Sequence, residues 1–146
     1  MEPVTLKCKI INVKGFDVIY DPIFADEEKI CMAALVKDRG IFITDSFLKL
    51  SENAQYFVLL HELGHQEHDH INKSTLFDFD LVYAIATIIG IIPRQEMEAD
   101  DFAAFEIGYE AAASAMEETI VVLSEEYPEL SLQDLRLRLR RLKNQL

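Results

Sequence analysis

Residues 57–65, FVLLHELGH, contain two histidines four positions apart, His61 and His65, with Glu62 directly after the first. The pattern predicts an α-helix, on which a spacing of four returns to the same face, so that both imidazoles can reach one metal ion. Imidazole and carboxylate groups in so apolar a stretch are costly unless something pairs with them. A bound metal ion would be such a partner.

The same spacing indicates the chemistry of a zinc peptidase. Glu62 would lie beside the metal, where it can take a proton from zinc-activated water and pass it to the leaving amine. The alternative, an exposed cluster of His and Glu, is disfavoured by the apolar surroundings and by Gly64. Because Gly costs a helix up to about 1 kcal/mol relative to Ala, its presence suggests close packing. Candidate donors to the developing oxyanion are His68, His70, Tyr83 and Tyr109.

A catalytic zinc site takes three protein ligands and leaves a fourth position for water. The spacing H-E-x-x-H-x-x-G-x-x-H is not met, because His68 stands where that pattern has Gly and Ile71 where it has His. His68 and His70 follow the motif directly. However, His68 would lie about 10 Å from His61 along a straight helix, too far to share the ion. The third ligand is therefore expected further along the chain.

Residues 93–104, PRQEMEADDFAA, predict a second helix, with Pro in its first turn and good helix formers after it. Glu96 and Asp100 share a face, whereas Glu98 points roughly 200° away from Glu96. The pair suits a site in which Glu96 binds the metal and Asp100 orients a ligating histidine. A solvated acidic helix start is the alternative. With HELGH upstream, we favour Glu96 as the ligand.

These motifs together resemble the ImmA/IrrE family of gluzincin metallopeptidases. The likeness rests on residues 50–52 (LSE), 57–65 and 96–103 (EMEADDFA), roughly the central third to half of the chain. Residues 105–109 (FEIGY) depart from the family's usual Leu-Met-Pro-like continuation. The resemblance implies zinc as cofactor, with the following residues in its site: His61, His65 and Glu96 as ligands, Glu62 as general base, and Asp100 as partner of a ligand histidine.

The resemblance also implies a site-specific protease whose substrate is a DNA-binding repressor of a mobile element, such as a phage, or of a stress regulon. The chain itself shows no recognisable helix-turn-helix, so such a repressor would be encoded separately. A net charge of −12 disfavours direct binding to nucleic acid. The alternative function is a non-catalytic zincin-like binding module that engages a regulatory protein. The intact Glu62 favours the peptidase, because a purely structural site needs no base.

With 146 residues the chain is expected to form one domain, β-rich over residues 1–45 and helical over 46–146. Its start lacks the pattern of a secretory signal, and its most apolar stretch, residues 81–92, is shorter than the ~20 residues that span a bilayer. Cys8 and Cys31 form neither a metal pattern nor a disulfide framework, as is usual in a reducing compartment. We therefore expect a cytoplasmic protein with no membrane association.

The predicted fold class is α+β: a small N-terminal antiparallel sheet followed by a helical bundle that carries the HExxH helix, as in a minimal zincin-like metallopeptidase. Two hairpins are expected, from residues 7–13 with 16–20 and from 30–36 with 41–44. By analogy with zincins, residues 40–45 would be the sheet edge that holds an extended peptide. Helices are predicted at residues 52–70, 78–90, 94–107, 109–126 and 132–146.

The last predicted helix is both basic and amphipathic. Residues 131–146 carry five basic side chains against one acidic, and their leucines recur at spacings of three and four. Two interpretations are open. The helix either docks on the acidic body of the protein, which we favour, or binds a partner protein through its leucines.

Overall fold

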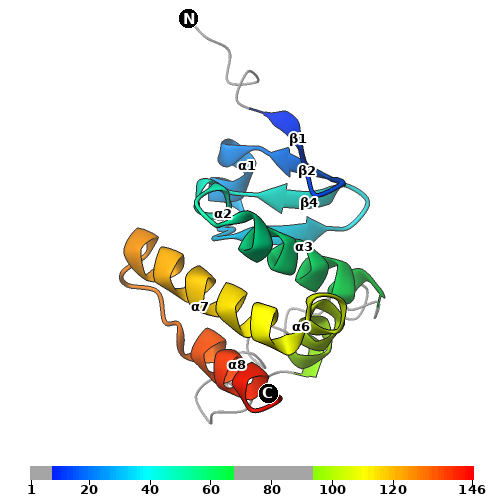
Figure 1. Cartoon of the computed structure of the whole chain (residues 1–146). Coiled ribbons are helices and arrows are strands. Elements are labelled where there is room, and N and C mark those ends of the chain that lie inside the picture. Colours follow the sequence, from blue (N-terminus) through cyan, green and yellow to red (C-terminus); the bar gives the residue numbers. More distant parts are fainter. Residues whose placement is uncertain (1–7, 68–93) are drawn as a thin grey trace, which may run out of the picture.

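The computed structural model of the chain describes residues 8–67 and 94–146 (Figure 1). A four-stranded sheet forms the N-terminal part, and packed helices follow it. In Figure 1 the helix α3 lies against the sheet, α7 crosses below α3, and α8 lies beneath α7. The arrangement confirms the predicted α+β class with the HExxH motif on a helix beside the sheet.

The first hairpin pairs β1 (Lys9–Val13) with β2 (Phe16–Tyr20) in antiparallel fashion. Its two-residue turn consists of Lys14 and Gly15, with φ angles of 51° and 88°. Positive φ at both positions gives a turn whose twist matches that of the flanking strands. The predicted hairpin is therefore confirmed.

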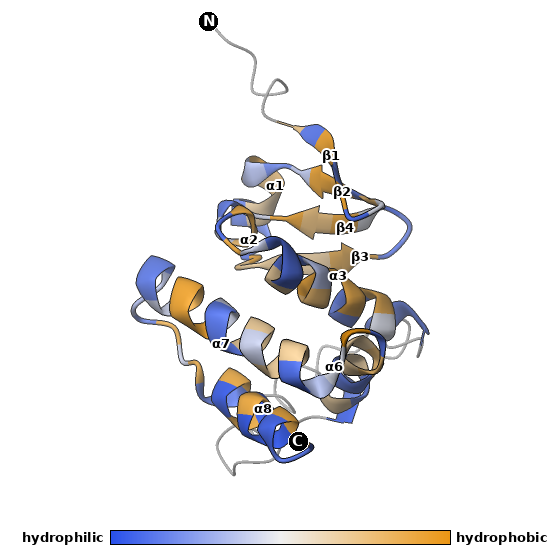
Figure 2. Cartoon of the chain, viewed as in Figure 1, coloured by the Kyte–Doolittle hydropathy of each residue, from blue (hydrophilic) through white to orange (hydrophobic). Residues whose placement is uncertain are grey.

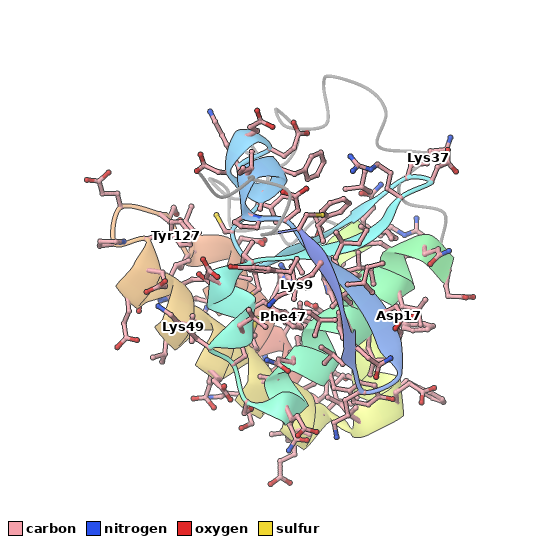
Figure 3. The ribbon with its side chains drawn as sticks, turned by 90° about the horizontal axis from the view of Figure 1, so that it is seen from above. Lys9, Asp17, Lys37, Phe47, Lys49 and Tyr127 are labelled. Atoms are coloured by element: carbon pink, nitrogen blue, oxygen red, sulfur yellow. The ribbon has the colours of Figure 1, made fainter. Side chains whose placement is uncertain are left out.

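The second hairpin joins β3 (Ala33–Val36) to β4 (Gly40–Ile43), also antiparallel and as predicted. However, β4 pairs in parallel with β2, and the strand order is β1-β2-β4-β3. The expectation of a purely antiparallel sheet was therefore wrong, because the two hairpins join through a parallel pair. Lys37, in the turn between β3 and β4, extends away from the body of the molecule (Figure 3).

The expected sheet edge at residues 40–45 was also wrong. β4 is an inner strand, and β3 forms the edge beside α3. The physical reason is the run Ile41-Phe42-Ile43, which is buried at every position rather than alternately. Successive apolar side chains need cover on both faces, and an inner strand provides it. Figure 2 shows the apolar colour along most of β4.

Two short helices were not predicted: α1 (Pro22–Glu27) and α2 (Asp45–Leu48). Each begins at a side-chain cap, since Asp21 accepts a hydrogen bond from the Phe24 amide at 3.1 Å and Thr44 accepts one from the Phe47 amide at 3.3 Å. Such caps are strong helix start signals. The Phe47 side chain is fully buried and points into the molecule (Figure 3).

The long helices agree closely with the sequence pattern. α6 (Arg94–Ile107) and α7 (Tyr109–Glu126) have the predicted limits, and α8 (Gln133–Lys143) is slightly shorter than predicted. The described part of α3 covers Glu52–Glu67. The end of its predicted range, residues 68–70, and the predicted helix at 78–90 lie outside the described residues. No helix in the described ranges is both long and apolar enough to cross a membrane.

α8 packs on α7 with Leu132 and Leu142 buried. Its charges pair with the acidic body, because Arg141 binds Asp101 on α6 and Lys143 lies 3.5 Å from Glu117 on α7. The structure thus has the helix docked, which is the interpretation favoured from the sequence.

Close packing at Gly64 joins α3 to α6. A Cβ atom placed on Gly64 would lie 3.0 Å from the Ala99 Cα and 3.0 Å from the Phe102 Cβ. At these distances a methyl group would fit only if the backbone of α6 moved away by a few tenths of an ångström. The close packing inferred from the sequence is therefore present, and it sets the distance between the two helices that carry the motifs.

Gly64→Ala should destabilise the protein although Ala is the better helix former. Overpacking costs about 1–3 kcal/mol, and helix propensity returns up to about 1 kcal/mol, for a net loss of about 1 kcal/mol. Thermal unfolding followed by circular dichroism should show Tm lower by about 2–4 °C. Gln66→Ala, at an exposed position of the same helix, is the control. A Tm for Gly64→Ala at or above that of the unaltered protein would contradict the packing argument.

Candidate metal centre

Helices α3 and α6 bring His61, His65 and Glu96 together. Glu96 Oε1 lies 3.0 Å from His61 Nε2 and 3.5 Å from His65 Nε2, and the two ring nitrogens are 3.1 Å apart. These side chains are 9%, 13% and 13% exposed. Among the residues that the structure describes, they form a group whose ligand atoms all lie within 4.8 Å of one another.

The donor set fits a zinc ion. Ligand atoms about 2.0–2.1 Å from one tetrahedral zinc lie roughly 3.3 Å from each other, close to the separations observed here. Two imidazoles and one carboxylate are also ligand types that zinc accepts. The spacing of four in HELGH places both histidines on one face of α3. Glu96, on the face of α6 that it shares with Asp100, meets them there.

Asp100 holds one of the cluster's histidines in a defined orientation. Its Oδ1 lies 2.7 Å from His61 Nδ1, and its side chain is almost completely buried. With Nδ1–H donated to this carboxylate, Nε2 would present its lone pair to a bound metal ion once it has lost its own proton. Burial alone would lower the pKa of His61, but hydrogen bonds and charges from Asp100 and Glu96 together raise that pKa to about 10.

The carboxylates of the site differ in the direction of their pKa shifts. Burial favours the neutral acid at Asp100, yet the nearby Arg138 charge and the His61 hydrogen bond bring its pKa down to about 2. Burial acts likewise on Glu96, but hydrogen bonds to His61 and His65 hold its pKa well below the usual value. Both groups are therefore anionic at neutral pH, as a ligand and its supporting carboxylate must be.

Glu62 behaves in the opposite way. Burial raises the pKa of Glu62, and the charges of His61 and His65 only partly oppose this. Its Oε1 accepts a hydrogen bond of 3.1 Å from the Leu35 amide on β3. The carboxylate is thus held beside the cluster with an affinity for protons higher than that of an ordinary Glu.

A cavity of about 430 Å³ adjoins the cluster and is lined on one side by residues of β3. His61, Glu62, His65 and Glu96 line it together with residues of α7 and α8. The rest of the lining is largely apolar and includes Leu35, Phe57, Val58, Met116, Leu123 and Leu135. The remaining polar residues of the lining are Gln95, Thr119 and Arg138, so the hollow is largely but not wholly apolar away from the cluster.

The other candidates from the sequence lie elsewhere. Glu98 points away from the cluster, as expected, and its carboxylate lies 3.7 Å from Arg94 Nε. The Tyr109 hydroxyl donates to Asp101 at 3.0 Å, and Tyr109 is not among the residues that line the cavity. The remaining candidate oxyanion donors, His68, His70 and Tyr83, lie outside the described residues.

Arg138 was not predicted as a site residue, because the sequence pattern only placed it among the five basic side chains of residues 131–146. In the structure it is buried beside Asp100. A signal was present, because Arg138 lies three residues after Leu135 and four before Leu142, on the leucine face of the helix. A charge on a buried face implies a buried partner.

In a comparison with known families, residues 23–131 match Peptidase family M48. The protein belongs to this family. The M48 match covers both the HELGH helix and α6. No curated protein and no solved structure matches the chain.

The M48 protein is thus a zinc metallopeptidase of the HExxH type, and its His/His/Glu cluster agrees with that assignment. An enzyme of this class acts on peptide bonds, so its substrate is a protein or peptide. The alternative of a non-catalytic binding module is set aside. The ImmA/IrrE family, which the motifs resemble, is not the one matched, so that finer assignment stays a prediction.

Glu96→Ala should remove most of the zinc from the M48 peptidase. The unaltered protein should carry about one zinc per chain, and the loss of affinity in the variant should exceed the roughly 10–100-fold typical for losing a partner outside the ligand set. Elemental analysis after gel filtration measures the content. Glu98→Ala, two positions along the same helix, is the matched control and should keep its zinc. Equal zinc in both variants would exclude Glu96 as a ligand.

Proposed function

We propose that this protein is a site-specific endopeptidase in which His61, His65 and Glu96 hold the zinc and Glu62 is the general base. The observation that carries the proposal is the position of Glu62. Its carboxylate lies between the ligand cluster and the edge strand β3, at the cavity where a peptide bond would have to enter. A structural zinc site would have no use for a carboxylate held in that place.

When bound, zinc would polarise the scissile carbonyl and lower the pKa of water toward ~7. The chain's own residues supply the proton transfers. Glu62 takes the proton of the attacking water, and the raised pKa of its carboxyl suits it to hold that proton until the amine leaves. The Leu35 amide, donating to Glu62 Oε1, fixes the carboxylate during both transfers.

The substrate would bind as an extended strand along β3. This strand is one of the two edges of the sheet and contributes Ala33, Ala34 and Leu35 to the cavity lining. Backbone pairing with an edge strand gives affinity for any extended peptide, while adjoining pockets select side chains. The apolar lining from α3, α7 and α8 would favour a peptide that places a large apolar side chain next to the scissile bond.

The narrower proposal follows from the ImmA/IrrE resemblance and makes the substrate a separate, helix-turn-helix repressor of a phage, another mobile element or a stress regulon. A net charge of −12 disfavours binding to DNA, so the enzyme would bind such a repressor by direct protein–protein contact. We place the reaction in the cytoplasm, where thiols stay reduced, and Cys8 and Cys31 are both free.

Glu62→Gln should keep zinc but lose peptidase activity by roughly 10²–10⁴-fold, because the amide cannot accept the proton of the attacking water. The assay is cleavage of a library of fluorescence-quenched peptides, with products identified by mass spectrometry and zinc measured in the same samples. Glu67→Gln, on the exposed side of α3, should cleave normally. Cleavage by Glu62→Gln at the rate of the unaltered protein would contradict the role of Glu62 as the general base.

The zinc-loaded protein should cut a helix-turn-helix repressor encoded beside its own gene at a single position. The measurement is intact-mass analysis of the purified repressor after incubation, with Glu62→Gln in parallel. One pair of fragments that is missing with the variant is the expected result. An intact repressor, alongside active cleavage of library peptides, would reject this substrate while leaving the peptidase assignment in place.

A further inference from the structure

Arg138 brings a buried positive charge from α8 to the edge of the metal centre. Its Nε and Nη2 donate to the two oxygens of Asp100 at 2.8 Å and 2.9 Å. Nη1 lies 3.2 Å from Asp134 Oδ2 and 3.5 Å from Glu96 Oε1. Nη2 is also 3.5 Å from His61 Nδ1. The side chain is only 9% exposed.

A charge buried in this way is not explained by stability. Pairs of buried ions often contribute no more than apolar side chains of similar volume, because desolvation offsets their attraction. Two of its neighbours on the same side of α8 are Leu135 and Leu142, and a leucine at 138 would continue that apolar face. The presence of arginine therefore indicates a requirement of the site.

The geometry shows what that requirement is. A guanidinium bound in bidentate fashion fixes both oxygens of a carboxylate in one plane, which a single point charge does not do. Asp100 Oδ1, held in this manner, is the atom that lies 2.7 Å from His61 Nδ1. The arginine thus determines where Asp100 points, and Asp100 determines the ring orientation and tautomer of His61.

Arg138 also balances charge. Asp100 and Glu96 are two buried carboxylates near one histidine, and their mutual repulsion would grow if either stood without a cation nearby. Arg138 contacts both of them. Its charge therefore offsets part of that repulsion before any metal binds.

We propose that Arg138 is a positioning residue of the zinc site, acting through Asp100 on His61, so that docking of α8 completes the metal centre. The proposal rests on the ligand set proposed above. It gives the C-terminal helix a role in the chemistry, although the M48 match ends at residue 131, before α8 begins.

The same two helices provide a matched control. Arg141 Nη1 and Nη2 donate to the two oxygens of Asp101 at 2.9 Å and 2.7 Å. This second bidentate pair also ties α8 to α6, one position along from Asp100. Asp101 contacts Tyr109 rather than the zinc cluster. Loss of Arg141 should therefore loosen the docking of α8 without disturbing His61.

The test is the zinc dissociation constant of the full-length chain, measured by competition with a chromophoric chelator. Arg138→Met should weaken zinc binding roughly 10–100-fold, the range for partners of metal ligands, and Arg141→Met should stay within about threefold of the unaltered protein. Circular dichroism and Tm show that each variant is folded. Arg138→Lys restores the charge but not the fork, and should bind zinc with intermediate affinity.

A double-mutant cycle with Asp100→Asn tests the route of the effect. If Arg138 acts through Asp100, then Arg138→Met should change zinc affinity by less than about threefold once Asp100 is Asn. If Arg138→Met weakened zinc binding as much in the Asp100→Asn protein as in the unaltered one, the proposal would be overturned. So would equal losses in Arg138→Met and Arg141→Met, which would indicate general loosening of α8.

Failure of this proposal and failure of the proposed ligand set are distinguishable. A protein that binds zinc normally with Arg138→Met in place contradicts only the role of Arg138. A protein that binds no zinc before any substitution contradicts both. If Arg138→Met does not fold, Arg138→Lys carries the test, and unaltered zinc affinity in that variant would overturn the need for a bidentate partner.

Discussion

The contact of Gly64 with Ala99 and Phe102 is the constraint on which the site depends. It sets how closely α3 approaches α6, and every ligand of the proposed zinc site lies on one of those two helices. A metal site tolerates errors of only a few tenths of an ångström in its ligands. The missing side chain at position 64 therefore allows the helix spacing that the proposed ligand set needs.

The sheet and α8 then complete the site from opposite sides. β3 supplies the Leu35 amide that holds Glu62, and α8 supplies Arg138, which holds Asp100. Glu62 and Asp100 are thus each fixed by a donor from a different part of the chain. Buried charges are stable only when they are paired. The stability of the fold and the proposed chemistry therefore both require these donors beside the acids of the site.

Features set by local sequence could be predicted, whereas features set by distant pairing could not. The limits of α6 and α7 follow from their periodicity and flanking residues, and the face shared by Glu96 and Asp100 follows from helix geometry. The parallel pairing of β2 with β4 brings together strands separated by α1 and β3. It has no turn motif in the sequence that would indicate it, as a hairpin has. The wrong edge strand resulted from reading order in sequence as order in space. The unbroken apolar run of β4 was the available clue.

Arg138 shows the same limit within the site. Its partner Asp100 is 38 positions away, so helix periodicity alone cannot join them. The sequence does contain a charged residue on a leucine face. From this one can infer that a buried partner exists, but not which residue it is. The structure identifies Asp100 as the partner, and this ion pair connects the basic C-terminal helix to the candidate metal centre.

The most direct test of this account is a crystal structure of the zinc-loaded protein with anomalous diffraction recorded on both sides of the zinc absorption edge. The account predicts one zinc peak, with His61 Nε2, His65 Nε2 and a Glu96 oxygen at about 2.0–2.2 Å and Asp100 still bonded to His61 Nδ1. A zinc ion bound elsewhere, or bound at the HELGH motif without Glu96, would contradict it.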